Sequence, residues 1–247
     1  MILPSEVSSV VTILYVIPAQ WVTFRRQNGG FNRVLIDNKG DNMKRISVII
    51  MGLLLVALAV FGCASQPSGS DWVTLIDGDK GLENWNRIGD ANWRSEGGAI
   101  VADKGKGGFL VSQDSYKDFE IYAEFWAESD TNSGIFLRGS DPAKVTSENA
   151  YEVNIWDIRP DPSYATAAIV NVAAVPVPIV YKAGGRWNTF EISAKGAELT
   201  VKFNGVVTAR AQNSLHASGP FALQFGVGVK GATSGPIKWR KVQIRSL

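Results

Sequence analysis

A strict two-residue alternation constrains the fold of this chain more than any other sequence feature. In Phe119-Glu120-Ile121-Tyr122-Ala123-Glu124-Phe125-Trp126, the odd-numbered residues share one face and the even-numbered residues share the other. This period is typical of a β-strand with one face in a core. Leu199–Phe203 alternates likewise and runs into Asn204-Gly205. That dipeptide favours a tight hairpin because both residues accept positive φ.

Strands, rather than helices, are predicted throughout the chain after Cys63. No stretch of about twelve residues in this part keeps the apolar spacing of three and four that an amphipathic helix needs. Many short antiparallel strands joined by glycine-containing turns favour an all-β sandwich or jelly roll. Further strands are predicted at 190–194, 221–225 and 241–245. Ala165–Tyr181, with Pro176 and Pro178, is predicted as a strand followed by a loop packed over a sheet.

Residues 43–62 are predicted to be a signal peptide. Met43-Lys44-Arg45 is a short basic segment, Ile46–Phe61 is almost wholly apolar, and Val60-Phe61-Gly62-Cys63 resembles a bacterial lipobox. An uncleaved membrane anchor and an ordinary signal peptide are the alternatives, although a span needs about 20 apolar residues. We expect lipidation of Cys63, which would tether an exported protein to a membrane at the periplasmic or outer-membrane face.

Residues 1–42 have neither clean periodicity nor the order of a signal peptide. We interpret them as a mis-annotated N-terminal extension, with Met43 as the true initiator. Lys39-Gly40-Asp41 can be encoded by a purine-rich run that contains a ribosome-binding sequence, so the upstream DNA tests this hypothesis. The predicted organisation is therefore an extension (1–42), a signal peptide (43–62), a linker (63–70) and one domain (71–247).

Charge and composition exclude several classes of protein. Residues 1–62 carry six of the 25 Lys and Arg and three of the 23 Asp and Glu, so the remaining residues have a net charge of about −1. We therefore expect no nucleic acid partner and no attraction to an anionic membrane surface. Cys63 is the single cysteine, so no intrachain disulfide can form. The single histidine, His216, excludes a multi-histidine metal site.

A series of short blocks, in order, carries a resemblance to a known family. Together they resemble the 3-keto-disaccharide hydrolase domain family, which has a concanavalin A-like jelly-roll fold. The resemblance covers about residues 71–247. It implies no cofactor; a divalent cation is conceivable but not indicated. The blocks are Trp72–Gly78 with Leu82–Trp85, Trp93–Ile100, Gly108–Ser112, Tyr116–Glu120, Asn132–Arg138, Tyr151–Asp157, Gly185–Asn188 and Gly219–Gln224.

Two positions depart from the family pattern. Many relatives carry His shortly after the Leu-Gln strand, where this chain has Phe225-Gly226-Val227-Gly228. Many relatives also have Gly where this chain has Ala167, within Thr166-Ala167-Ala168-Ile169. These departures bear on the predicted activity more than on the predicted fold.

A candidate sugar-binding face lies on the strand that begins at Tyr151. Glu152, Asn154 and Trp156 project to one side of it. An indole can cover the C–H face of a sugar, and the polar groups can bind its hydroxyls. A solvent-exposed face with a chance mixture is the alternative. The acidic and aromatic residues of 119–126 repeat this mixture. The predicted substrate-binding residues are Asn154, Trp156, Asp157, Trp126 and Gln224.

The resemblance implies a glycoside hydrolase that acts on 3-keto-disaccharides or 3-keto-glycosides. A ketone at C3 acidifies the hydrogen at C2, so that a base can remove it and the glycosidic oxygen at C1 can leave; water then adds back. The predicted catalytic residues are Glu152 as base or acid, with Arg138 and Asn132 as donors to the enolate oxygen. A structural ion pair for Arg138 and turn chemistry for Asn132 are equally open. The two-carboxylate glycosidase mechanism also remains open.

A competing hypothesis is a non-catalytic, lectin-like lipoprotein that binds carbohydrate. The same fold and aromatic face would serve this function, since a fold does not determine a function. The missing family histidine favours this alternative. A structural envelope protein is a third possibility, for which neither sugar binding nor sugar release is expected.

Overall fold

The computed structural model describes residues 21–25, 31–35 and 71–247, which belong to two separate units. In the first unit, β1 (Trp21–Arg25) pairs antiparallel with β2 (Phe31–Leu35), a hairpin that the sequence analysis did not predict. The predicted signal peptide, Cys63 and the linker lie outside the described residues. Within the described ranges, no helix is long and apolar enough to cross a bilayer.

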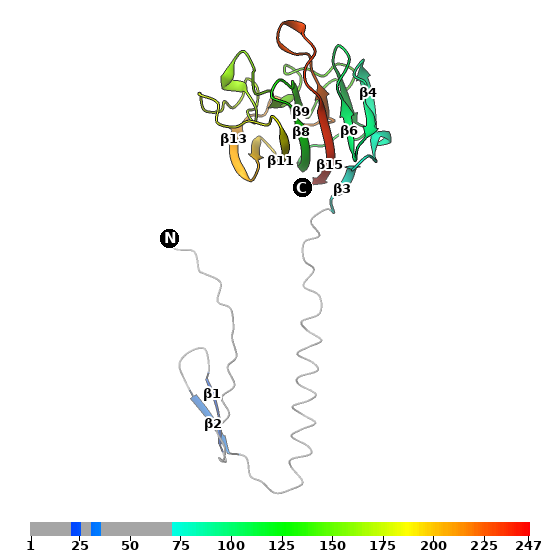
Figure 1. Cartoon of the computed structure of the whole chain (residues 1–247). Helices are drawn as coiled ribbons and strands as arrows, with labels where there is room; N and C mark the ends of the chain where they lie inside the picture. The colour runs from blue at the N-terminus through cyan, green and yellow to red at the C-terminus, as the bar shows by residue number, and fades with distance from the viewer. Residues whose placement is uncertain (1–20, 26–30, 36–70) are drawn as a thin grey trace. The chain divides into compact units, whose positions relative to one another are not determined.

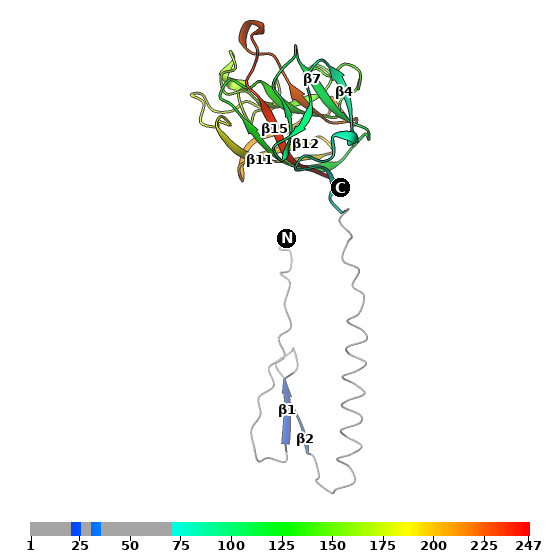
Figure 2. The same ribbon diagram turned by 45° about the vertical axis from the view of Figure 1, so that its right-hand side comes forward.

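The second unit is a sandwich of two antiparallel sheets (Figures 1 and 2). The smaller sheet has five strands in the order β10-β9-β14-β7-β4. The larger has eight, in the order β13-β12-β11-β8-β15-β6-β5 with β3 paired to β15. This confirms the predicted all-β jelly-roll sandwich. The strands are β3 (Val73–Asp77), β4 (Trp85–Gly89), β5 (Arg94–Glu96), β6 (Ala99–Ala102), β7 (Gly108–Ser112), β8 (Phe119–Ala127), β9 (Ser133–Leu137), β10 (Tyr151–Ile155), β11 (Arg186–Lys195), β12 (Glu198–Phe203), β13 (Val206–Gln212), β14 (Ala222–Phe225) and β15 (Ile237–Ser246).

Strand β8 shows how the alternation produces this fold. From Phe119 to Ala127, every odd-numbered residue is buried and every even-numbered residue is half-buried. β8 pairs with β11 on one side and β15 on the other, so it lies inside the larger sheet. Its odd-numbered side chains therefore enter the core, and its even-numbered side chains form part of the outer face of that sheet.

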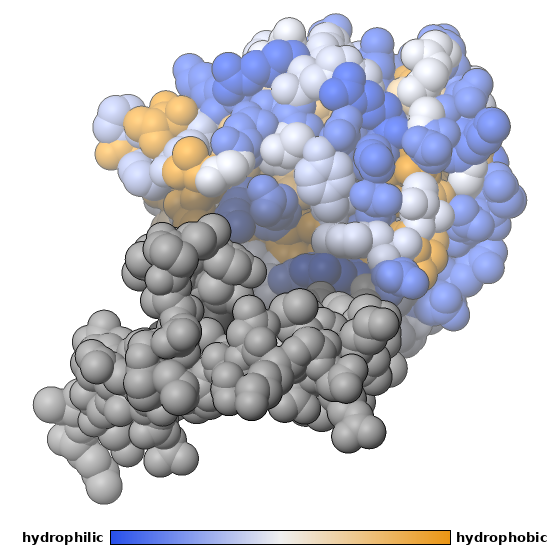
Figure 3. Space-filling view, turned by 90° about the horizontal axis from the view of Figure 1, so that it is seen from below, coloured by the Kyte–Doolittle hydropathy of each residue, from blue (hydrophilic) through white to orange (hydrophobic). Residues whose placement is uncertain are grey.

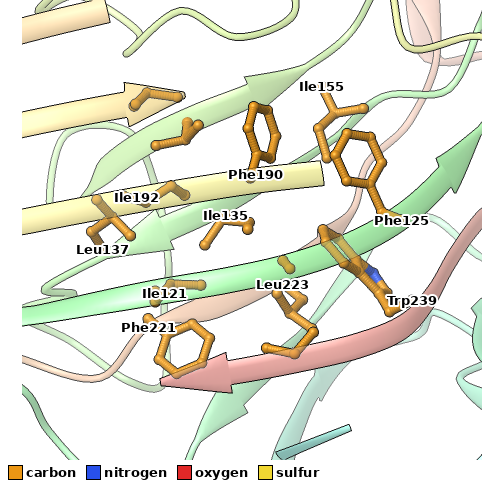
Figure 4. Packing of buried hydrophobic residues seen from close by; sticks show 14 of the residues in the cluster. Ile121, Phe125, Ile135, Leu137, Ile155, Phe190, Ile192, Phe221, Leu223 and Trp239 are labelled. Atoms are coloured by element: carbon orange, nitrogen blue, oxygen red, sulfur yellow. The ribbon is translucent and has the colours of Figure 1, made fainter. Parts of the chain in front are cut away.

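The core between the sheets is built from side chains of both layers. Phe125 stacks on Phe190 with 5.0 Å between ring centroids and packs against Trp239 at 5.5 Å. Figure 4 shows Ile135 of β9 and Leu223 of β14 within the same cluster. Burial of each such side chain stabilises the fold by about 1.5–3 kcal/mol. The inner faces are thus occupied by packing, so a ligand site lies outside this core.

The hairpin predicted at Asn204-Gly205 is confirmed. It joins β12 to β13, and both residues have positive φ, 49° and 80°. The strands predicted at 190–194, 221–225 and 241–245 fall on β11, β14 and β15. No α-helix occurs among the described residues; three single-turn 3₁₀ helices occur at Leu82–Asn84, Pro162–Tyr164 and Val229–Gly231.

The segment 165–181 differs from the prediction, because the structure forms no strand there. Instead, its backbone bonds to the free edge of β10. The N–H of Val170 donates to the carbonyl of Glu152 at 2.9 Å, and the N–H of Asn154 donates to the carbonyl of Ala168 at 3.0 Å. The segment therefore covers the edge of the smaller sheet, as an apolar, proline-containing segment can do without forming a regular strand.

The visible surface of the domain is largely hydrophilic. In the view of Figure 3, hydrophobic residues form small separate groups among the hydrophilic ones. The exposed large hydrophobic residues include Val177, Val180 and Leu215, which lie in connecting segments. Isolated apolar side chains of this kind are normal on soluble domains.

Candidate functional site

The site is built on β10, whose side chains divide between two faces as predicted. Tyr151, Val153 and Ile155 belong to the core. Glu152 and Asn154 project to the outer face of the five-stranded sheet, because neighbours on a strand alternate. The predicted separation of Glu152 and Asn154 from the core face is confirmed.

Strand pairing brings Gln224 onto the same face. Asn154 pairs with Gly134 of β9, and Leu223 of β14 pairs with Ile135 of β9. Gln224 therefore lies beside Gly134, on the side opposite Asn154. Gly134 has no side chain, and it is buried because neighbouring side chains lie over it. Its ideal Cβ position lies 3.6 Å from Cγ of Glu152 and 3.6 Å from Cε2 of Phe136, so the carboxylate-bearing chain lies next to Gly134.

Three polar atoms of the predicted site are buried without a hydrogen-bond partner in the described part of the chain. They are Oδ1 of Asn154, Oε1 of Gln224 and Nε1 of Trp156. Nδ2 of Asn154 donates to the carbonyl of Tyr164 at 2.6 Å, which fixes the amide orientation. Each unsatisfied buried group costs about 1–3 kcal/mol.

Glu152 is the titratable group of this face. Its side chain is buried, and the loss of solvation raises the pKa of its carboxyl from 4.5 to about 7. The negative charge of Glu148 also raises this pKa, whereas the positive charge of Arg159 lowers it. Both the protonated and the ionised form of this carboxyl are therefore populated near neutral pH, which suits proton transfer.

Arg159 is a cation of the site that the sequence analysis did not single out. Its guanidinium carbon lies 5.7 Å from the ring centroid of Trp156, at the distance of a cation–π contact. It forms no ion pair with Glu152. The sequence could have indicated Arg159 as a site residue, because it follows the predicted site residue Trp156 by three positions and precedes Pro160, which restricts the loop.

Asn132 lies at the rim of this face. Its Nδ2 donates to the carbonyl of Val227 at 2.6 Å. Asn132 and Gln224 line one cleft of about 390 Å³ over the ends of β4, β7 and β14. The structure therefore brings Asn132 near Gln224, although one of its amide protons is already used to hold the 226–228 loop.

Arg138 is taken up by structural contacts and does not join the site. Its side chain is 1% exposed. Nε donates to the carbonyl of Lys117 at 2.7 Å, and Nη1 donates to the carbonyl of Gly196 at 2.8 Å. Nη2 forms an ion pair with Asp118. Of the two roles left open for Arg138, the structure favours the structural one.

Asp157 is likewise occupied by its own loop. Oδ1 accepts from Oγ1 of Thr166 at 2.6 Å and from the N–H of Ala183 at 2.9 Å, while Oδ2 accepts from the N–H of Gly184 at 2.9 Å. The carboxylate therefore ties the end of β10 to two loops, and this leaves it no evident role with a ligand.

Trp126 lies on the opposite side of the sandwich from Glu152, which corrects the expectation that the two could share a site. It projects from the outer face of β8, in the larger sheet. Nζ of Lys238 lies 4.7 Å from its ring centroid, so a cation already covers the indole. The two acidic and aromatic faces belong to different sheets, and the core separates them.

The sequence of this domain is similar to that of a known family. Residues 71–245 match the model of the 3-keto-alpha-glucoside-1,2-lyase-like domain. The chain belongs to this family. The lyase-like domain therefore includes every element of both sheets described above, from β3 to β15. No curated protein matches the chain. Among the described residues, no group of three or more His, Cys, Asp and Glu could hold a metal ion.

Solved structures share the fold of this lyase-like domain. Two candidate glycosyl hydrolases from Parabacteroides distasonis have a TM-score of 0.58 at 23% and 16% identity. They cover 72% and 71% of this chain, and 100% and 94% of their own chains are covered. A Bacillus subtilis protein with a galectin-like fold has a TM-score of 0.52 at 8% identity, over 70% of this chain and 93% of its own. At such identities the likeness establishes the fold, which glycosyl hydrolase-like and lectin domains share.

Proposed function

We propose that the outer face of the five-stranded sheet binds a 3-keto-glycoside and that Glu152 cleaves it by elimination. One observation carries the proposal: a buried carboxyl with a pKa of about 7 lies on a face where neighbouring amide and indole atoms lack partners. A base that titrates near neutral pH is well matched to proton abstraction. The family description, which refers to a 3-keto-glucoside lyase, supports the choice of substrate class.

The proposed chemistry begins with the ketone at C3, which acidifies the hydrogen at C2. The Glu152 carboxylate takes that proton, and the electron pair of the C2–H bond moves into the enolate. The C1–O bond then breaks, and its electrons leave with the glycosidic oxygen, which takes a proton from water. A C1–C2 double bond conjugated to the ketone results, and Glu152 returns its proton to solvent. Addition of water across this double bond would complete a net hydrolysis.

The enolate oxygen needs a positive charge or a hydrogen-bond donor. We assign this role to Arg159 in place of Arg138, because Arg159 lies against Trp156 on the Glu152 face and forms no ion pair within the described ranges. The second amide proton of Asn132 is the other candidate donor. Asn154 and Gln224 would accept hydroxyl protons through their unpartnered oxygens.

The test uses 4-nitrophenyl 3-keto-glucoside and its parent glucoside. We expect release of 4-nitrophenol from the keto compound alone, after correction for spontaneous release, and in heavy water we expect deuterium at C2 of the hydrated sugar product. Glu152→Gln should abolish release, whereas Glu198→Gln, an exposed residue on β12 of the other sheet, should retain it. Release from the parent glucoside, or activity in Glu152→Gln, would contradict the proposal.

Binding without release would instead support the lectin-like alternative. The specific observation that favours it is the absence of the family histidine, since Phe225-Gly226-Val227-Gly228 stands in its place. In that case the unpartnered atoms of the face would bind sugar hydroxyls and Glu152 would have no catalytic role. Calorimetric titration with the keto compound separates the two functions.

We also propose that the domain acts outside the cytoplasm, tethered by lipid on Cys63. The lipobox-like Val60-Phe61-Gly62-Cys63 supports this placement. Cys63→Ser should abolish incorporation of radiolabelled fatty acid and block removal of residues 43–62. Wild-type protein in the membrane fraction without incorporated fatty acid would favour the uncleaved anchor. The mass of the mature N-terminus would identify the cleavage site directly.

A further inference from the structure

A cleft on the five-stranded sheet includes Gln224, although no residue of β10 lines it. It has a volume of about 390 Å³ and lies over the end of β4, the start of β7 and the end of β14. Residues 143–145, from the segment between β9 and β10, form one wall. Gly89, Gly107, Gly108 and Gly226 line it, and at three of them a Cβ would lie under 3 Å from another part of the chain, so these glycines allow the walls of the cleft to pack closely.

The register connects this cleft to Glu152. Gln224 pairs with Phe109 on β7, and Phe109 packs edge-on against Phe136 with 5.2 Å between centroids. Phe136 in turn pairs with Glu152. Gln224 is two strands from Asn154, about 10 Å away at ordinary strand spacing. A ligand whose first sugar lies at Glu152 and that extends across the sheet would therefore reach Gln224 with its next unit, and Phe109 lies one strand farther away.

The charged residues that line the cleft are both positive. Lys106, before β7, and Lys144, between β9 and β10, come from distant segments and both line it, and no Asp or Glu does. Both lysines are exposed, and neither is in an ion pair among the described residues. The charge of Lys144 also acts on Glu148 at longer range. Since residues 63–247 have a net charge of about −1, two unpaired lysines over one cleft are a local feature.

We propose that this cleft binds a second sugar unit that carries a carboxylate, as in a glycoside of a uronic acid. The inference rests on the proposed function, because it takes the keto sugar to lie at Glu152. Phe109 would cover an apolar face of the second ring, and Oε1 of Gln224 would accept a hydroxyl proton. Lys106 and Lys144 would contact the carboxylate as point charges, and their attraction would be screened by salt.

The test compares two ligands that differ only in charge: a 3-keto-glucosyl glucuronic acid and the matching 3-keto-glucosyl glucose. Binding is measured by calorimetry on the full chain with Glu152→Gln, which prevents turnover. We expect about tenfold tighter binding of the acid at low salt, since two partly screened contacts each contribute about threefold. The preference should diminish in 0.5 M salt. The Debye length is already about 10 Å at 0.1 M salt, and it is shorter at 0.5 M, so the attraction between the lysines and the carboxylate is screened more strongly.

The matched variants place the effect in the cleft. Lys106→Gln with Lys144→Gln should remove the preference for the acid and leave binding of the neutral ligand unchanged. Lys117→Gln with Lys195→Gln changes the net charge equally at exposed positions outside the cleft and should retain the preference. Equal affinity for both ligands, or a preference that survives loss of Lys106 and Lys144, would overturn the inference.

Failure of the proposed function has a different signature. If wild-type protein releases sugar equally well from acidic and neutral keto ligands, the elimination stands and the carboxylate cleft falls. If the wild-type protein binds the acidic ligand more tightly than the neutral one, with or without the C3 ketone, and releases no sugar, the cleft is supported as a binding site and the elimination is excluded. The ketone and the carboxylate are thus tested separately.

Discussion

Nη2 of Arg138 lies 3.2 Å from Oδ1 of Asp118, and this pair joins the end of β9 to the start of β8. The same carboxylate oxygen accepts the N–H of Gly196 at 2.7 Å. Because β9 and β8 belong to different sheets, the pair links the two layers of the sandwich at one end. Arg138 also has a φ of 54°, an uncommon conformation for a non-glycine residue.

Arg138→Met should therefore destabilise the domain without altering its chemistry. The change leaves the carbonyls of Lys117, Gly196 and His216 without their donor, which we expect to lower the free energy of unfolding by about 3 kcal/mol. Denaturant titration measures this loss. At temperatures where the variant is folded, kcat for keto-glycoside cleavage should stay within about twofold of the wild-type value; a large loss of kcat would return Arg138 to the catalytic group.

Glu152→Gln should stabilise the domain in a pH-dependent way. Because the folded pKa is raised from 4.5 to about 7, the folded state binds more protons than the unfolded state between these values, so wild-type stability falls as pH rises through this window. The full penalty, about 3 kcal/mol, is present above pH 7. The variant lacks it, and should exceed the wild type in denaturant titrations at pH 8 but not at pH 4. An equal difference at both pH values would contradict burial of the charge.

The pH dependence of cleavage should move in opposite directions in two variants. As a base, Glu152 must be deprotonated, so kcat/KM should rise with pH through about 7. Arg159→Ala removes a charge that lowers this pKa and should shift the rise to higher pH. Glu148→Gln removes a charge that raises it and should shift the rise to lower pH. Profiles of initial rate against pH, corrected for spontaneous elimination, test both shifts; two unmoved profiles would exclude Glu152 as the titrating group.

Ala167→Gly should stabilise the domain. Ala167 is fully buried with a φ of 74°, which disfavours a side chain by about 1 kcal/mol. Glycine adopts this backbone conformation without strain. We expect the midpoint of thermal unfolding to rise by about 2–4 °C, with cleavage unchanged. A change in activity with no change in stability would assign the position to ligand binding instead.

The strands and their inward faces were predictable because the information is local. Alternation in 119–126 placed Phe119, Ile121, Ala123 and Phe125 in the core, and the hairpin followed from Asn204-Gly205. The same local rule separated Glu152 and Asn154 from the core side of β10. By contrast, the segment 165–181 took its conformation from contacts with the edge of β10, which no local pattern encodes.

The sequence by itself therefore determined the fold class and the family, and it separated Glu152 from the core side of β10. Only the tertiary structure decided which polar groups join Glu152. The order β10-β9-β14 places Gln224 two strands from β10 in the same sheet, whereas β8 carries Trp126 to the other side of the core. Likewise, partners at Lys117, Gly196 and His216 converted Arg138 into a structural residue. The physical reason is that side-chain direction depends on neighbours along a strand, while strand order depends on packing between residues distant in the chain.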